Sequence, residues 1–188
     1  MMRKENGFTI IELMITLAVA AVVMGVAAPS LGGFVKNSAL RNQVYDMLSS
    51  ITTARSEALK NGSRVVMCRS ANPLAATPSC GGTTDNWSTG WLLFISQDSN
   101  TVYNAGTDVL VKVGMPAPSQ INVLSNGTGN NYLVFNPDGT LDETGAAQSA
   151  VCDDRGTGHG RLITVGLVGR PNLTTGTPSS ALATCDPA

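Results

Sequence analysis

The sequence predicts an α+β chain in which one long helix precedes a domain of short β-strands. Three observations support this fold class. An apolar run broken by few polar residues covers residues 8–28. Apolar residues then recur at three- to four-residue spacing as far as residue 61, which is the period of one helical face. Beyond residue 63, short apolar segments alternate with stretches rich in glycine, serine, threonine and asparagine, as expected of strands joined by turns.

The apolar run at residues 8–28 is long enough, as a helix, to span a bilayer of about 30 Å. Arg3 and Lys4 precede it, so the positive-inside rule predicts a cytoplasmic N-terminus and an external remainder. A cleaved secretory signal and a plain signal anchor are the alternatives. Neither explains Glu12, whose charge costs the membrane-inserted state a few kcal/mol. A secretory cleavage after Ala28 would also place Pro29 directly behind the scissile bond.

The segment Gly7-Phe8-Thr9-Ile10-Ile11-Glu12-Leu13 resembles the processing site of type IV pilins and type II secretion pseudopilins. In that family a prepilin peptidase cuts on the cytoplasmic side, between the residues that match Gly7 and Phe8. The new amino group, here that of Phe8, is then methylated. Glycine suits the cleavage site because it lacks a Cβ and lets the backbone lie extended in a protease cleft.

This resemblance implies three regions. Residues 1–7 are the prepilin leader, residues 8–29 the transmembrane and filament-core half of the helix, and residues 30–188 a periplasmic or extracellular helix plus β domain. The implied location is a single pass through a bacterial inner membrane, followed by the pilus or the periplasm. The implied partners are prepilin peptidase, the inner membrane, and other major and minor pilins.

In such an assembly Glu12 can form an ion pair between neighbouring subunits. When subunits pack side by side, its carboxylate can meet the amino group of a neighbour's Phe8. A paired charge is tolerable in a low-dielectric filament core, whereas an unpaired one is costly. The pair therefore penalises any axial stagger that leaves Glu12 alone, and we expect Glu12 to act in subunit assembly.

The second half of the helix is expected to run from residue 30 to Asn61. Pro29 should kink the helix rather than end it, because the apolar period resumes beyond it. Asn61-Gly62 supplies the stop, since glycine readily takes the left-handed conformation. The apolar stripe comprises Leu31, Phe34, Val35, Val44, Met47, Leu48, Ile51, Ala54 and Ala58.

Seven short segments after Ser63 are candidate strands, each flanked by turn residues. Asn136-Pro137-Asp138-Gly139 is a strong turn signal. The stretches 70–89 and 170–188 are expected to be irregular loops. The candidate strands are Arg64–Arg69, Gly90–Ser96, Val109–Val113, Ile121–Ser125, Tyr132–Phe135, Ala150–Cys152 and Arg161–Leu167.

The four cysteines are even in number and fall in the part of the chain predicted to be external, where disulfides are the default. Four cysteines allow three pairings. We favour Cys68–Cys80, which closes the loop after the first strand, and Cys152–Cys185, which holds the C-terminal tail. The spacings contain no CxxC pair, so no metal site is expected.

No catalytic function is expected. The sequence contains no GxxxxGK[ST] or HExxH motif, and its single histidine has no neighbouring nucleophile. We therefore predict a protein that is not an enzyme and needs no cofactor. The net charge of −1 also gives no global attraction to nucleic acid or anionic lipid.

A second, narrower resemblance covers most of the chain. The segments 53–62, 65–68 and 87–94, together with Gly169-Arg170, are similar to minor pilins and pseudopilins of the FimT/FimU/GspH type. The resemblance implies a pilin-like fold, with the helix packed on antiparallel sheets, and a low-abundance component of the filament tip or priming complex in a type IV pilus. The alternatives are a DNA-binding minor pilin for natural transformation and a minor pseudopilin of a type II secretion system.

The DNA-binding alternative depends on Arg155, Arg161 and Arg170, with Lys112 expected nearby. Asp153 and Asp154 stand against it, and Pro171 and Asn172 occupy the place where the family's DNA-binding members continue with cationic residues. So few phosphate contacts predict weak, sequence-independent binding that falls steeply with salt.

Overall fold

The computed structural model describes residues 7–82, 85–126, 131–142, 145–176 and 185, and residues 26–31 by their backbone alone. Residues 1–6, with Arg3 and Lys4, and most of the C-terminal tail lie outside this description. The chain divides into two units, residues 1–38 and 39–188.

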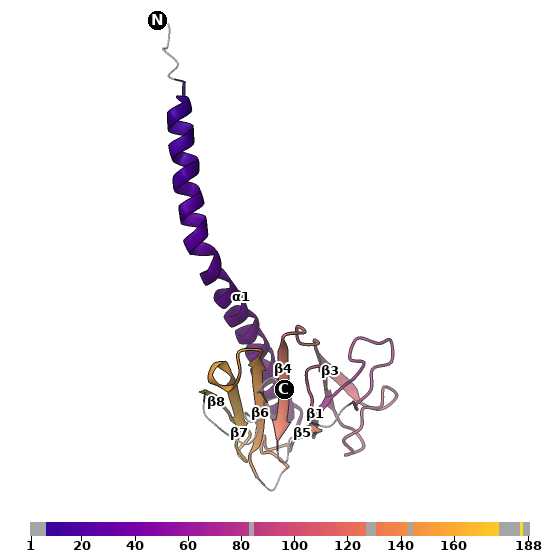
Figure 1. The fold of residues 1–188 in the computed structure, drawn as a ribbon. Coiled ribbons are helices and arrows are strands. Elements are labelled where there is room, and N and C mark those ends of the chain that lie inside the picture. Colours follow the sequence, from indigo (N-terminus) through magenta and orange to yellow (C-terminus); the bar gives the residue numbers. More distant parts are fainter. Residues whose placement is uncertain (1–6, 83–84, 127–130, 143–144, 177–184, 186–188) are drawn as a thin grey trace, which may run out of the picture. The chain divides into compact units, whose positions relative to one another are not determined.

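One helix, α1 (Ile10–Asn61), contributes to both units (Figure 1). It continues through Pro29, as the apolar period beyond this residue predicts. It ends at Asn61 because Gly62 adopts a left-handed conformation, with φ of 58°. The predicted stop is confirmed.

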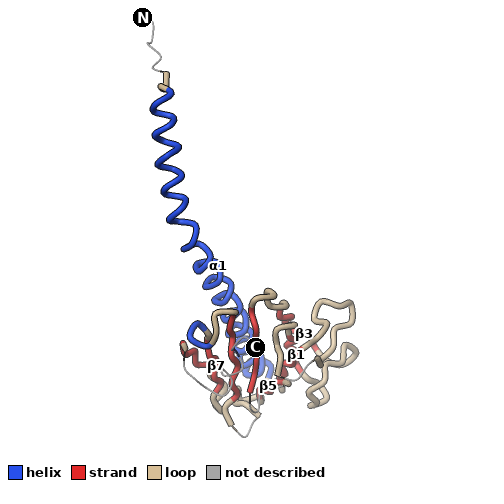
Figure 2. The backbone as a smooth tube through the Cα atoms, in the orientation of Figure 1, coloured by secondary structure: helices blue, strands red, loops and turns tan. Residues whose placement is uncertain are grey.

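The second unit holds two four-stranded sheets, both antiparallel throughout. The first has the order β3-β2-β1-β5 and the second the order β4-β6-β7-β8. Figure 2 shows the strands of both sheets beside the last turns of α1. The strands are β1 (Val65–Arg69), β2 (Trp91–Ile95), β3 (Val109–Gly114), β4 (Ile121–Asn126), β5 (Tyr132–Phe135), β6 (Ala147–Asp153), β7 (Arg161–Val165) and β8 (Pro171–Thr175).

The last turns of α1 and the inner faces of both sheets share one core. Six helix residues in this core are at most 2% exposed, and they recur at the helical period expected of one buried face. They pack with inward-facing residues of β1, β2, β4, β5, β6 and β7. The predicted packing of a helix on antiparallel sheets is confirmed. The six helix residues are Leu40, Val44, Met47, Ile51, Ala54 and Ala58.

The outer faces of both sheets are also covered, and each carries one disulfide. Cys68 of β1 is bonded to Cys80 within a cluster that includes Phe94 and Val134. Cys152 of β6 is bonded to Cys185 beside Ala150 and Leu162. These are the two pairs favoured from the sequence. Each bond holds a loop or tail residue over the outer face of one sheet.

The predicted strands need three corrections. β6 begins at Ala147, three residues earlier than expected, and β7 ends at Val165 rather than Leu167. The stretch from residue 170, expected to be an irregular loop, contains the edge strand β8. Its sequence is polar and begins with proline, which edge strands tolerate because one side of the strand needs no ladder hydrogen bonds. Pairing with β7 therefore decides its structure.

Candidate assembly segment and surface residues

The segment around the predicted cleavage site leads directly into α1. Gly7, Phe8 and Thr9 precede the helix, which begins at Ile10. The side-chain oxygen Oγ1 of Thr9 accepts a hydrogen bond from the backbone N–H of Glu12 at 3.3 Å. Thr9 is thus a helix N-cap. The spacing of threonine and glutamate is that of a capping box, which is a second reason, visible in the sequence, for a glutamate at position 12.

Glu12 lies in the first turn of α1 and is exposed. A carboxylate is favourable there, because the free N–H groups of a helix start carry partial positive charge. The same position keeps it within one helical turn of Phe8, whose amino group would be the new N-terminus after cleavage. Local helix chemistry therefore supports a charge at Glu12 without a charged partner among the residues that the structure describes.

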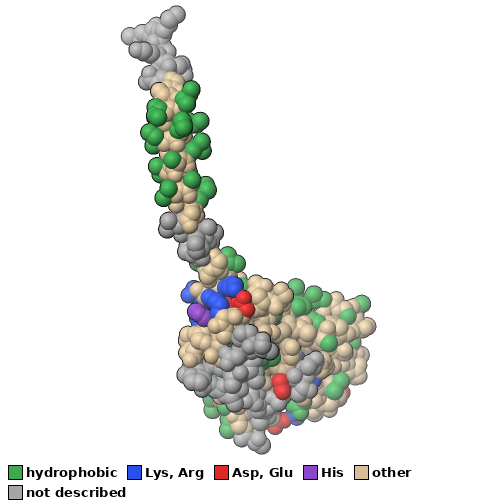
Figure 3. Space-filling model, viewed as in Figure 1, with side chains coloured by type: hydrophobic (Ala, Val, Ile, Leu, Met, Phe, Trp, Pro, Cys, Tyr) green, Lys and Arg blue, Asp and Glu red, His purple; other side chains and the backbone are tan. Residues whose placement is uncertain are grey.

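Between residues 8 and 25, apolar side chains project from every side of α1. The large ones are 57–81% exposed, and Figure 3 shows hydrophobic side chains along the visible face of this part of the helix. Among the side chains that the structure describes, no helix combines the length and the apolar character needed to cross a membrane. The exposed residues are Phe8, Ile10, Ile11, Leu13, Met14, Ile15, Leu17, Val19, Val22, Val23 and Met24.

Gly169 of the Gly169-Arg170 pair occupies a tight contact. It has φ of 73°, and a Cβ there would lie 2.0 Å from the backbone oxygen of Gly139. That oxygen accepts a hydrogen bond from Arg55 Nε at 3.2 Å. The glycine therefore allows the β7–β8 turn to pack closely against the turn at Gly139 and against Arg55 of the helix. Its role here is structural.

Arg155 is the first of the three arginines considered for DNA binding. Its Nε and NH2 atoms lie 3.0 and 2.6 Å from Oδ2 of Asp153, whose side chain is fully buried. Burial works against ionisation of Asp153, but hydrogen bonds and the positive charge of Arg155 outweigh it and lower the pKa of this carboxyl. The hydrogen bond to Asp153 in turn raises the pKa of Arg155. The charge of Arg155 is thus largely compensated within the fold.

Arg161 and Arg170 lie at opposite ends of the β7–β8 hairpin. Arg161 begins β7, and its NH1 donates to the backbone oxygens of His159 and Gly160 at 2.8 and 3.0 Å. Arg170 directly precedes β8 and is exposed. The two ends of β7, Arg161 and Val165, are four residues apart, which corresponds to roughly 13 Å along the strand. The structure places Arg155 and Arg161 at one end of this sheet and Arg170 at the other.

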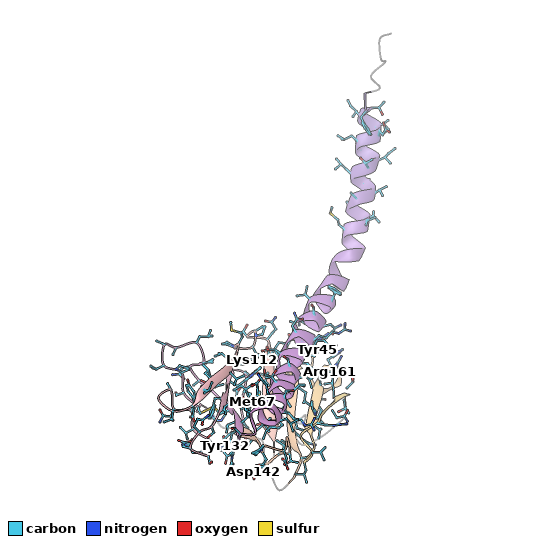
Figure 4. All side chains as sticks on the ribbon, turned by 180° about the vertical axis from the view of Figure 1, so that it is seen from behind. Tyr45, Met67, Lys112, Tyr132, Asp142 and Arg161 are labelled. Carbon is cyan, nitrogen blue, oxygen red and sulfur yellow. A yellow bond between two sulfur atoms is a disulfide. The ribbon has the colours of Figure 1, made fainter. Side chains whose placement is uncertain are left out.

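Lys112 does not join these arginines. It lies on β3, in the other sheet, and its Nζ contacts Asp46 Oδ1 at 2.8 Å. Figure 4 shows Lys112 and Arg161 on opposite sides of α1. The expectation of a shared basic patch that includes Lys112 is therefore wrong.

Comparison with known proteins gives two family matches. A model described as type II transport protein GspH matches residues 43–169. A model of the prokaryotic N-terminal methylation motif matches residues 2–28. No curated protein matches the chain.

Two crystal forms of the type IV minor pilin FimU from Pseudomonas aeruginosa have a similar fold. The first has a TM-score of 0.59 at 17% identity, covering 79% of this chain and 98% of FimU. The second has a TM-score of 0.54 at 18% identity, covering 77% and 98%. At these identities the likeness is one of fold, and it agrees with the helix-and-sheets architecture predicted from the sequence.

Proposed function

Because the chain belongs to the GspH family of type II transport proteins and carries a prokaryotic N-terminal methylation motif, we propose that it is a minor pilin in the tip or priming complex of a type IV pilus. The family assigns a structural rather than an enzymatic role, as a minor pilin or pseudopilin. It also implies processing by prepilin peptidase and assembly with other pilins.

The observation that carries this proposal is the apolar surface of α1 between residues 8 and 25. Its side chains face outward on every side, and a helix of this kind is stable only when something else covers it. Each buried apolar Å² contributes about 25 cal/mol, so covering so many large side chains is strongly favourable. We propose that the inner membrane covers them first, and that the corresponding helices of neighbouring subunits cover them in the filament.

Glu12 fits the same assembly. In a filament core of packed helices its carboxylate would be withdrawn from water, which is unfavourable unless a positive group accompanies it. The free amino group of a neighbour's Phe8 supplies that group once the leader has been removed. Thr9 contributes by starting the helix at a defined residue, which sets the distance between Phe8 and Glu12.

FimU, whose fold this chain shares, is a type IV minor pilin, and we take the pilus as the first candidate on that ground. The description of the matching family favours a second candidate, a minor pseudopilin of a type II secretion system. Deletion in the parent bacterium separates the two. If the protein is a pilus component, deletion should abolish surface pili and leave protein secretion normal. If it is a pseudopilin, deletion should impair protein secretion and leave surface pili normal.

Processing of the full chain tests the pilin assignment itself. Expressed with a prepilin peptidase, the protein should yield a mature N-terminus at Phe8, methylated, when analysed by mass spectrometry. Gly7→Leu should remain as an uncleaved precursor, because the cleavage site needs a residue without a side chain. Gly25→Leu is a matched control that leaves the site untouched and should be processed normally. A mature N-terminus at Pro29 would contradict the proposal.

A further inference from the structure

A pocket of about 370 Å³ opens between α1 and the β7–β8 hairpin, within the second unit. Helix residues Arg41, Val44 and Tyr45 line it on one side, and Arg161 and Leu173 line it from the strands. Figure 4 shows Tyr45 and Arg161 on the same side of α1. The pocket therefore combines two guanidinium groups with an aromatic and two aliphatic side chains.

No described residue compensates the positive charge of this pocket. Arg41 is exposed, and its side chain forms no hydrogen bond or ion pair with another residue of the described ranges. Arg161 donates NH1 to two backbone oxygens, which holds its head group in place without neutralising it. No described acidic residue lines the pocket. In contrast, Arg64, Lys112 and Arg155 each pair with an aspartate.

The apolar part of the pocket is open to a partner. Tyr45 is 63% exposed and Leu173 39% exposed, while Val44 beneath them is buried. Tyrosine and arginine are the residues that contribute most often to the binding energy of protein interfaces. Two arginines also provide the planar donor groups that bind a carboxylate through paired hydrogen bonds.

We propose that the pocket formed by Arg41, Tyr45 and Arg161 receives an acidic side chain, accompanied by an apolar residue, from a neighbouring subunit of a different pilin. The proposal rests on the proposed function, which supplies such neighbours. Charge complementarity identifies the carboxylate, and the exposed Tyr45 and Leu173 identify its apolar neighbour.

A nucleic acid fits the pocket less well than a protein carboxylate. Two arginines neutralise at most two phosphates, which gives little affinity at physiological salt. The charge of Arg155 is already compensated by Asp153, and Arg170 lies at the far end of the hairpin. The apolar side chains of the pocket have no counterpart in a phosphate backbone.

Photo-crosslinking in assembled filaments tests the proposal. The full chain carries benzoylphenylalanine in place of Tyr45, and mass spectrometry identifies the peptide that it captures. We expect a peptide of another pilin subunit that contains Asp or Glu. Arg41→Glu should lower the yield of this product about tenfold by charge repulsion. Replacing the captured acid by Lys in the Arg41→Glu background should restore it.

Three further variants keep the result interpretable. Arg170→Glu makes the same charge change at the other end of the hairpin and should leave the yield unchanged. Arg161→Lys keeps the charge but loses the planar donor group, and should lower the yield less than Arg41→Glu. Because the side chain of Arg41 forms no hydrogen bond or ion pair with a described residue, Arg41→Glu should melt at the wild-type temperature. Arg161→Gln removes the second charge of the pocket and should also lower the yield.

Several outcomes would overturn the proposal. The first is an unchanged yield of the crosslinked product in Arg41→Glu, and the second is an equal loss of this product in Arg170→Glu. The third is crosslinking of Tyr45's replacement to DNA or to a second copy of this chain. The fourth is a captured-acid→Lys change that fails to restore the product in the Arg41→Glu background. A wild-type chain that is absent from filaments would overturn the proposed function as well. If the wild-type chain is present in filaments but Arg41→Glu does not change the crosslinking yield, only the proposal for the pocket would be overturned.

Discussion

Trp91 Nε1 donates a hydrogen bond to Ser50 Oγ at 3.0 Å, in a core where both residues are fully buried. The same hydroxyl accepts a hydrogen bond from Lys112 Nζ at 2.9 Å and donates to the backbone oxygen of Asp46 at 2.8 Å. One serine thereby connects α1 with β2 and β3. All of these residues belong to the second unit, and their hydrogen bonds hold the helix against the first sheet.

Ser50→Ala should destabilise the protein by about 2 kcal/mol, because the buried indole N–H of Trp91 loses its acceptor. Urea unfolding of the full chain in mild detergent, followed by tryptophan fluorescence, measures the change. Ser56→Ala is the matched control, since its hydroxyl bonds only to the Thr52 backbone oxygen of the same helix. The control should stay within about 0.5 kcal/mol of wild type. Equal effects of both variants would contradict the role of Ser50.

Asp153→Asn should destabilise the protein by about 2 kcal/mol at neutral pH, because Arg155 loses a charged partner. The pKa of Asp153 is lowered from the ordinary value of 3.8, so the stabilisation is present above that value and is lost as the pH falls through the lower, folded-state pKa. The difference between wild type and Asp153→Asn should therefore shrink as the pH falls below the ordinary carboxyl pKa of 3.8. Unfolding curves on both sides of this value measure it, and a difference independent of pH would contradict the assignment.

Removal of either disulfide should destabilise the second unit, and the larger effect should come from the longer loop. Chain entropy predicts about 3 kcal/mol for the separation of 12 residues between Cys68 and Cys80. It predicts about 4 kcal/mol for the separation of 33 residues between Cys152 and Cys185. Paired Cys→Ser variants, compared by thermal melting, test this order. Four titratable thiols in the native wild-type protein, prepared under oxidising conditions, would contradict both bonds.

Glu12→Ala should still be cleaved and methylated at Phe8 but should incorporate poorly into filaments, because the amino group of Phe8 loses its partner. Glu12→Gln keeps the shape and removes the charge, so it should incorporate equally poorly. Quantitative immunoblots of sheared filaments measure incorporation. Normal incorporation of both variants would remove the pairing argument.

Thr9 has a separate and smaller role, which its own variants can isolate. Thr9→Val removes the oxygen that accepts the Glu12 backbone N–H, at a cost of about 1 kcal/mol to the helix start. Thr9→Ser keeps that oxygen and should assemble like wild type. We expect Thr9→Val to lower incorporation less than Glu12→Ala does, in the same immunoblot measurement. A Thr9→Ser variant as defective as Thr9→Val would contradict the capping role.

Features that depend on local patterns could be predicted from the amino-acid sequence. The apolar period located the helix and its stop at Asn61, since every residue of one helical face recurs within four positions. Most strands were found because short apolar segments between turn residues have few other structures available. The GFTIIEL segment identified the methylation motif, although the capping role of Thr9 was overlooked within it.

Features that depend on which elements become neighbours could be seen only in the folded chain. β8 is too polar to be found as a strand, and it exists because β7 offers a free edge. The contacts of Ser50 with Trp91, of Gly169 with Gly139, and the pocket of Arg41 and Arg161 join segments far apart in the chain. Such contacts follow from the packing of the helix and the two sheets around a single core, and a local pattern carries no information about that packing.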